Sequence, residues 1–481
     1  MDENNTGQGA SIQGAAPQNT YAKTGRGRNV GIIIGVIIAI IVVISAYSIF
    51  FMKSETTFTE SGLPSETVWY VTYNGTTHNS TTNLITFQTG KGNYSYVIDA
   101  VTTNSSGIFT SGYEPQQENG TLTSGTKFAI QFNPFDRSKY VYVTDGNASL
   151  LAISSTNYSI TKIPIIINPT QPSYSHETTD VAVNPNGRFA YVTFQTAPFH
   201  LNATTYGIAV VNTSTNMVAK YVYINSTYPP YGISVTPDGR YAYVSDLGNQ
   251  TYIINLSTYQ VIKQLNFKCL TSIKYNGLGC AIAGVAIEPN GNAYLTDQDT
   301  NLVFVVNTTT FATTKTINLS TPHAFAGYSG AYSIALTSND KYAVVTAGIG
   351  YGLYTINITS GKVSKVIVPF FSAPLGVAIP KNSGYAYVVN FTGSSLWYVN
   401  ISSGQIANNV ELPNLLGISR GSGSSANGPR NIALSPDNKV LYVTDTTGGL
   451  YIINATSFQI MKEIPTGGSP SSVSDSRYGG T

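Results

Sequence analysis

Residues 232–265 read GISVTPDGRYAYVSDLGNQTYIINLSTYQVIKQL, and this stretch decides the fold. It divides into four short segments in which apolar and polar residues alternate, and turn residues such as Pro237, Asp238 and Gly239 separate them. This pattern is typical of a four-stranded antiparallel meander. One meander cannot bury both of its faces, so we expect neighbouring copies of it in the chain.

The same order of segments occurs seven times. Copies of the second segment read YVYVTD (140–145), FAYVTF (189–194), YAYVSD (241–246), NAYLTD (292–297), YAVVTA (342–347), YAYVVN (385–390) and VLYVTD (440–445). They recur about every 50 residues, the period of four-stranded propeller blades. At these residues the chain resembles the YVTN family of seven-bladed β-propellers, which occur in archaeal and bacterial surface proteins. The resemblance implies an all-β, seven-bladed propeller over residues 133–475 and says little about function.

The N-terminal part predicts a membrane anchor. Residues 1–30 are polar and form a disordered tail that ends in Lys23, Arg26 and Arg28. Residues 31–52 are almost wholly apolar and long enough to span a bilayer as one helix. Because the basic residues lie mainly before this helix, the tail is predicted to be cytoplasmic and everything after it extracellular. A cleaved signal peptide is the alternative, although the apolar run is longer than a typical signal sequence.

Residues 56–132 predict a second all-β unit with Asn-Gly turns between alternating strands. Its segment FTESGLPSETVWYVTYNG (58–75) resembles a small Ig-like β-sandwich module of archaeal extracellular proteins, and Trp69 is expected in its core. Phe128–Phe132 is either the last strand of this unit or the first strand of the propeller. If Ser471–Asp475 pairs beside Tyr140–Thr144, strands from both ends close the ring, and residues 476–481 form a tail.

Composition limits the partners. Charged residues make up 10% of the chain, against about 25% in an average soluble protein. The net charge of +2 comes without a basic stripe, so no nucleic-acid partner is expected. Cys269 and Cys280 are the only cysteines, and they are predicted to form a local disulfide outside the cell, with two free buried thiols as the alternative. Neither a metal site nor a cofactor is predicted.

Loop lengths predict where the propeller recognises other molecules. If the four strands of a blade are called A to D, the A–B and C–D turns are short, and the long segments fall in the B–C and D–A connections. Recognition concentrates on variable loops carried by a rigid scaffold. The candidate recognition face therefore carries Asp145, His176, His200, Asp246, Asp297, His323, Asn390 and Asp445. At strand ends Asp and Asn more often form Asx turns that hold the B–C hairpin, and this role is favoured over ligand binding for the Asp and Asn residues. Tyr231 and other loop tyrosines either stack on sugars or pack.

Eighteen N-x-S/T sequences after the apolar segment predict an extracellular glycoprotein. They begin at Asn74, Asn79, Asn93, Asn104, Asn119, Asn147, Asn157, Asn202, Asn212, Asn225, Asn249, Asn255, Asn307, Asn318, Asn357, Asn390, Asn400 and Asn454. Six of them open the C–D turns, where Asn is also favoured simply because its side chain hydrogen-bonds the turn backbone.

The residues favour a non-enzymatic surface protein that acts in recognition, adhesion or envelope architecture, with surface proteins or glycans as partners. A lactonase-like or quinone-dependent propeller enzyme is the second hypothesis, and a structural subunit of an envelope or filament assembly is the third. The G-x-S-x-G match at Gly417–Gly421 lies in a Gly/Ser-rich loop rather than between a strand and a helix, so it is not read as a nucleophile elbow.

Overall fold

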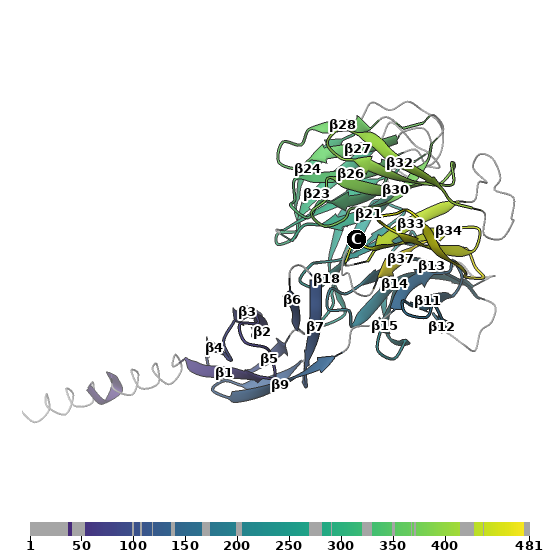
Figure 1. Cartoon of the computed structure of the whole chain (residues 1–481). Coiled ribbons are helices and arrows are strands. Elements are labelled where there is room, and N and C mark those ends of the chain that lie inside the picture. The colour runs from purple at the N-terminus through teal and green to yellow at the C-terminus, as the bar shows by residue number, and fades with distance from the viewer. Residues whose placement is uncertain are drawn as a thin grey trace, which may run out of the picture.

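The computed structural model describes residues 37–40, 53–98, 101–105, 108–117, 119–135, 140–165, 174–198, 204–268, 281–289, 291–319, 330–348, 352–366, 368–369, 372–413, 428–435 and 437–475. Two β-units follow one another in it (Figure 1). Of the apolar segment only residues 37–40 are described, as one helical turn. Within the described ranges no helix is long and apolar enough to cross a membrane.

The N-terminal unit consists of two sheets that share one core. Its strands are β1 (Ser54–Ser61), β2 (Trp69–Tyr73), β3 (Thr76–Ser80), β4 (Leu84–Thr89), β5 (Asn93–Ile98), β6 (Val101–Ser105), β7 (Ile108–Pro115), β8 (Asn119–Thr123) and β9 (Lys127–Phe135). One sheet has the order β4-β1-β9-β7-β6 and the other β3-β2-β5-β8. Trp69 is fully buried between them, as predicted, and its indole N–H donates to the Thr82 carbonyl at 2.7 Å. At the β2–β3 hairpin Asn74 and Gly75 both have positive φ, as a type I′ turn requires.

Strand β9 settles the ambiguity of Phe128–Phe132. It pairs in parallel with β1 and antiparallel with β7, and Phe132 is fully buried in the N-terminal core against Trp69. The segment therefore ends the N-terminal unit, and the first strand of the following unit begins at Tyr140.

The described residues between 140 and 475 form seven four-stranded antiparallel sheets. In chain order their strands are β10 (Tyr140–Thr144), β11 (Ser149–Ser154), β12 (Ile160–Pro164); β13 (Tyr174–Val183), β14 (Phe189–Pro198), β15 (Thr205–Asn212), β16 (Met217–Ile224); β17 (Pro230–Val235), β18 (Tyr241–Asp246), β19 (Gln250–Asn255), β20 (Gln260–Asn266); β21 (Ile282–Ile287), β22 (Asn292–Asp297), β23 (Leu302–Asn307), β24 (Thr313–Asn318); β25 (Ala331–Leu336), β26 (Tyr342–Ala347), β27 (Gly352–Asn357), β28 (Val363–Val366); β29 (Pro374–Ala378), β30 (Tyr385–Asn390), β31 (Ser395–Asn400), β32 (Gln405–Glu411); β33 (Pro429–Leu434), β34 (Val440–Asp445), β35 (Gly449–Asn454), β36 (Ile460–Pro465); and β37 (Val473–Asp475). All seven predicted YVTD-type segments lie on strands at the expected positions.

Packing between neighbouring sheets explains the burial pattern. The second and third strands of each sheet are buried on both faces, whereas most residues of the outermost strands, such as β20, are exposed. One hydrophobic cluster joins Tyr191 and Val210 of one sheet to Val244 and Ile254 of the next. The core therefore lies between sheets, so no single sheet is stable alone.

The sheets form a closed β-propeller. The innermost strands contact one another in the order β13, β17, β21, β25, β29, β33 and β37, and β37 returns to β13. Strand β37 supplies the innermost strand of the first sheet by pairing antiparallel with β10, with Tyr142 opposite Ser474. The ring thus closes with strands from the two ends of the unit. This pairing covers the edge of β10, which would otherwise be free to pair with another chain.

Candidate functional site

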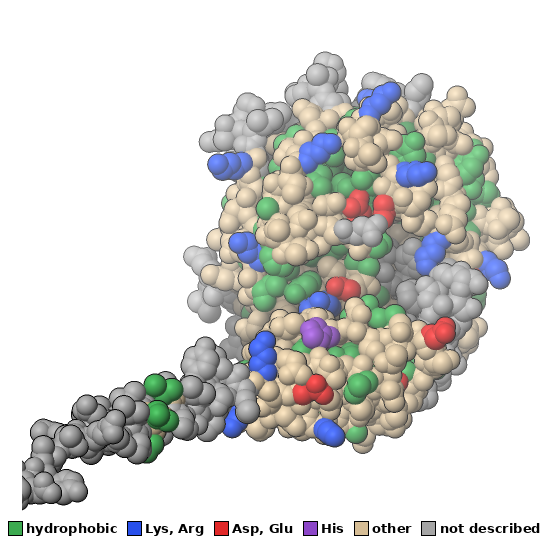
Figure 2. All heavy atoms as spheres, turned by 90° about the vertical axis from the view of Figure 1, so that its left-hand side faces the viewer, with side chains coloured by type: hydrophobic (Ala, Val, Ile, Leu, Met, Phe, Trp, Pro, Cys, Tyr) green, Lys and Arg blue, Asp and Glu red, His purple; other side chains and the backbone are tan. Residues whose placement is uncertain are grey.

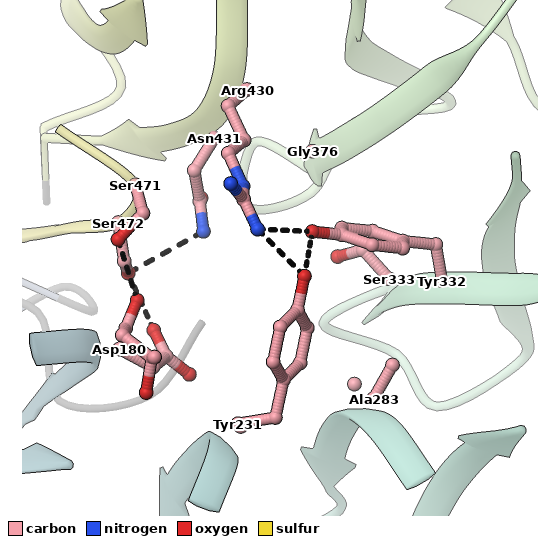
Figure 3. A pocket seen from close by; sticks show the side chains of 13 residues that line it. Asp180, Tyr231, Ala283, Tyr332, Ser333, Gly376, Arg430, Asn431, Ser471 and Ser472 are labelled. Carbon is pink, nitrogen blue, oxygen red and sulfur yellow. Dashed lines mark hydrogen bonds between the residues drawn. The ribbon is translucent and has the colours of Figure 1, made fainter. Parts of the chain in front are cut away.

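Residues on or directly before the innermost strands converge on a cavity of about 70 Å³ at the axis of the ring (Figure 3). Each of the seven sheets contributes to its lining. The residues at equivalent positions are Asp180, Gly232, Gly284, Ser333, Gly376, Asn431 and Ser472. Tyr231, Tyr332 and Arg430 each precede one of them and extend into the same space. The cavity is thus built from positions that are far apart in the sequence.

Glycines allow the innermost strands to approach one another this closely. A Cβ added at Gly232 would lie 2.1 Å from the Ala283 carbonyl oxygen of the next sheet. At Gly376 it would lie 2.8 Å from the Asn431 Cα. Both distances are shorter than van der Waals contact, so a side chain here would force the neighbouring strands apart.

The hydroxyl of the YVT motif links adjacent sheets. Thr296 Oγ1 accepts a hydrogen bond from the Gly284 amide of its own sheet and donates to the Tyr332 carbonyl of the next, at 2.8 and 2.9 Å. Ser245 makes the equivalent contacts with Gly232 and Ala283. This repeated bridge fixes the innermost strands around the cavity, and it gives the motif a structural role.

Among the described residues that line the cavity, Arg430 is the one cation. Its Nη2 donates to Tyr231 Oη at 2.7 Å and to Tyr332 Oη at 3.1 Å, and the two phenols are also hydrogen-bonded to each other. The rings pack edge to face with centroids 6.0 Å apart. Burial raises the pKa of Tyr231, so this phenol stays neutral beside the permanent Arg430 cation.

Asp180 lies across the cavity from this group (Figure 3). One carboxylate oxygen accepts from the Val181 amide and the Ser472 hydroxyl, and the other accepts from the Ile233 amide at 2.8 Å. Burial raises the pKa of Asp180, while its hydrogen bonds and the Arg430 charge oppose that rise. These contacts tie three sheets together and occupy both oxygens of the carboxylate.

The acids predicted for the recognition face are not among the residues that line the cavity. Asp145, Asp246, Asp297, Asn390 and Asp445 are all at most 5% exposed. The Asp246 carboxylate accepts from the Gly248 and Gln250 amides, both at 3.0 Å, and from the Ser226 hydroxyl at 2.7 Å. Asp297 accepts from the Ala281 and Asp299 amides. These side chains hold the turns after the second strands, the role that Asx-turn chemistry favours for them.

Several predictions fall outside the described residues. Among them are Cys269, Cys280, His200, Asn202, His323 and the Gly417–Gly421 segment. Only the backbone of His176 is described, in β13 opposite Thr196. Within the described part of the chain, no group of three or more His, Cys, Asp or Glu side chains has the arrangement of a metal site.

The six C–D turn asparagines adopt the same turn. The Asn255 Oδ1 accepts from the Ser257 and Thr258 amides at 2.9 and 3.0 Å, and Asn212, Asn307, Asn357, Asn400 and Asn454 accept in the same manner. The turn uses Oδ1, whereas a glycan is attached through Nδ2, so the two roles are compatible. Asn390 is different because it is buried and bonded to the Ala373 amide and Ser395. A glycan there is incompatible with the folded ring.

The cavity and the N-terminal unit lie toward opposite faces of the propeller. Cavity residues such as Tyr231 lie next to Pro230, which pairs with Asp246 at the B–C end of its sheet. Arg240, in the A–B turn at the other end, donates to Thr77 of β3 at 3.3 Å. The N-terminal unit therefore contacts the short-turn face, and the cavity lies nearer the long-loop face.

Sequence reasoning missed the cavity because its residues sit one or two positions before the repeated core of each first strand. Tyr231 drew attention only as a loop tyrosine, and Arg430 was not singled out. The sequence does contain one signal of the cavity. Directly before the first-strand core, one repeat has an arginine where the other repeats have uncharged residues.

Together, the fold and the cavity define a β-propeller protein with an N-terminal two-sheet β-unit. No protein-family model matches the chain, and no curated protein matches it. Among solved structures, hydrazine synthase from Kuenenia stuttgartiensis is similar to 65% of this chain over 92% of its own, with 18% identity and a TM-score of 0.49. A likeness at this level carries no inference about activity.

Proposed function

We propose that this protein is a membrane-anchored extracellular glycoprotein of the archaeal YVTN type. In this proposal residues 31–52 form its transmembrane helix, residues 56–132 an Ig-like spacer and residues 133–475 a seven-bladed propeller that recognises surface proteins or glycans. The observation that carries the proposal is the placement of the N-terminal unit on the short-turn face, through Arg240 and Thr77. With the spacer on that side, the long-loop face points away from the membrane and is available to a partner.

The surface composition supports an extracellular location. Charged side chains lie mostly singly among uncharged polar ones (Figure 2). Nine predicted glycosylation asparagines are exposed, namely Asn74, Asn79, Asn93, Asn119, Asn147, Asn157, Asn225, Asn249 and Asn318, and the six turn asparagines are partly exposed. This distribution would give a modifying enzyme access to most sites of the folded chain.

A non-enzymatic role is favoured over the enzyme and assembly alternatives. The acids that an enzyme was expected to place at the channel mouth are used in turns instead. The structural-subunit alternative lacks an observation of its own, since exposed apolar side chains such as Met217, Val261 and Met461 lie on separate sheets.

Mass spectrometry of intact protein and glycopeptides from the native membrane tests the proposal. We expect an uncleaved N-terminus and glycans only at Asn74 and beyond, with Asn390 unmodified. The variant Asn255→Asp should lose one glycan and keep its turn, since the carboxylate replaces the Oδ1 acceptor. An unglycosylated chain, or a chain that starts after the apolar segment, would overturn the anchored-glycoprotein proposal.

A further inference from the structure

The Arg430 guanidinium carries a charge that is not neutralised by an ion pair. Among the residues that the structure describes, no carboxylate lies within 4.0 Å of it, and its hydrogen bonds run from Nη2 to Tyr231 and Tyr332. A guanidinium has five N–H donors. Three of them therefore remain for a ligand, on a side chain that lines a cavity.

Hydroxyl groups around the cavity add further donors. Tyr231 and Tyr332 both accept from Arg430, so their own protons point elsewhere. One proton makes the hydrogen bond between the two phenols, and the second is left over. The Ser333 side chain lines the same cavity. A guanidinium and several hydroxyl donors that line one cavity are the kind of groups that bind an oxyanion.

Charge and volume restrict the anion. The cavity holds one cation, and the Asp180 carboxylate on its far side adds negative charge above its raised pKa. A dianion such as sulfate would meet one positive charge and one negative charge in a partly desolvated space, where repulsion is strong. A volume of about 70 Å³ is far below the roughly 300 Å³ at which pockets for drug-sized ligands begin. A monovalent carboxylate group meets both limits.

We propose that the axial cavity binds a single carboxylate group through Arg430, with the Tyr231–Tyr332 pair and Ser333 as neighbouring hydrogen-bond donors. The site differs from the buried turn acids and from the loops, and the inference does not depend on where in the cell the protein resides. The carboxylate belongs either to a free small acid or to an acidic sugar.

Titration of the full-length detergent-solubilised protein with acetate, glucuronate and sulfate, followed by ligand-observed NMR at constant ionic strength, tests the site. We expect saturable acetate binding, no saturable sulfate binding, and at least a tenfold weaker acetate Kd for Arg430→Gln. Arg188→Gln removes the same charge on the short-turn face and should bind as the wild type does. Additional binding of glucuronate would identify an acidic sugar as the source, and binding of acetate alone a free acid.

Two results would overturn the inference: no saturable acetate binding by the wild type, or equal binding by Arg430→Gln. If that variant does not fold, Tyr332→Phe provides the second test, because it removes one hydroxyl and keeps the cation. We then expect acetate binding about three- to tenfold weaker, and unchanged affinity would count against the site. These outcomes are independent of glycosylation and anchoring, so the failure of one proposal does not imply the failure of the other.

Discussion

Arg430 donates to Tyr231 at 2.7 Å although the two residues are 199 positions apart in the chain. They come from innermost strands of different sheets, and Tyr332 of a third sheet completes the group. Such a contact forms only when the ring is closed, so this cluster reports on closure as well as on the cavity.

The hydroxyls of Tyr231 and Tyr332 should be energetically coupled through Arg430. We expect Tyr231→Phe and Tyr332→Phe each to lower the free energy of unfolding by about 1–2 kcal/mol, because each removes an acceptor from a buried charged donor. The double variant should deviate from additivity by about 0.5 kcal/mol or more, measured by denaturant unfolding. Tyr385→Phe, far from the axis, is the control. Strict additivity would mean that the three side chains do not act as one group.

Stability should increase as the pH falls from 7 to 4. Burial, with a contribution from Asp297, raises the pKa of Asp299 to about 6, above the ordinary value of about 3.9. The folded state therefore holds this proton more tightly than the unfolded chain does. The added stability is fully present below about pH 3.9 and is lost as the pH rises through about 6.

The difference between wild type and Asp299→Asn isolates this effect. Because Asp299 is partly exposed, we expect the pH-dependent contribution to be about 1–3 kcal/mol and to be absent from the variant. Asp180, Asp246 and Asp297 have pKa values raised by burial too, so the variant should keep some slope of the same sign. Asp238→Asn, in an exposed turn, is the control. If the free energy of unfolding depended on pH in the same way in the wild type and in Asp299→Asn, the prediction would be wrong.

Loss of β37 should open the ring. Val473 is 2% exposed and packs with Val141 and Val143, and the Thr144 amide donates to Ser472. Truncation after Ser469 removes this strand and exposes the edge of β10, so we expect loss of cooperative unfolding and self-association, seen by light scattering. Truncation after Asp475 keeps the strand and is the matched control. A monomeric protein of unchanged stability after the longer truncation would show that closure does not depend on β37.

Asp246 should stabilise the folded state because its carboxylate accepts hydrogen bonds from two backbone amides. Asp246→Ala leaves the Gly248 and Gln250 amides without their acceptor inside the protein, and we expect a loss of about 2–4 kcal/mol in the free energy of unfolding. Asp238→Ala, at an exposed turn of the same sheet, should cost less than about 1 kcal/mol. Equal effects of the two substitutions in thermal or chemical unfolding would refute a turn-holding role.

Local pattern predicted the repeated sheets well because each strand and turn is specified within a few residues. The segment Tyr241–Asp246 is a strand with the predicted bounds, and Asn255 opens the predicted turn. The same local view favoured turn-holding for Asp246 and Asp297 but did not show that both are buried, since a carboxylate at a strand end has the same local sequence whether solvent or two backbone amides surround it. Burial is set by neighbouring segments that are distant in sequence.

The sequence by itself therefore determined the all-β repeat and the division into an N-terminal unit and a propeller. It left the pairing of Ser471–Asp475 beside Tyr140 open, and the structure decided it. The alternation of apolar and polar residues, the turn residues and the period of the repeat can all be read directly from the order of residues. Only the tertiary structure decided that Arg430, Tyr231, Tyr332 and Asp180 meet at one cavity. Closing the ring places one register position of seven distant strands around a common axis, and no local pattern records which side chains then face one another.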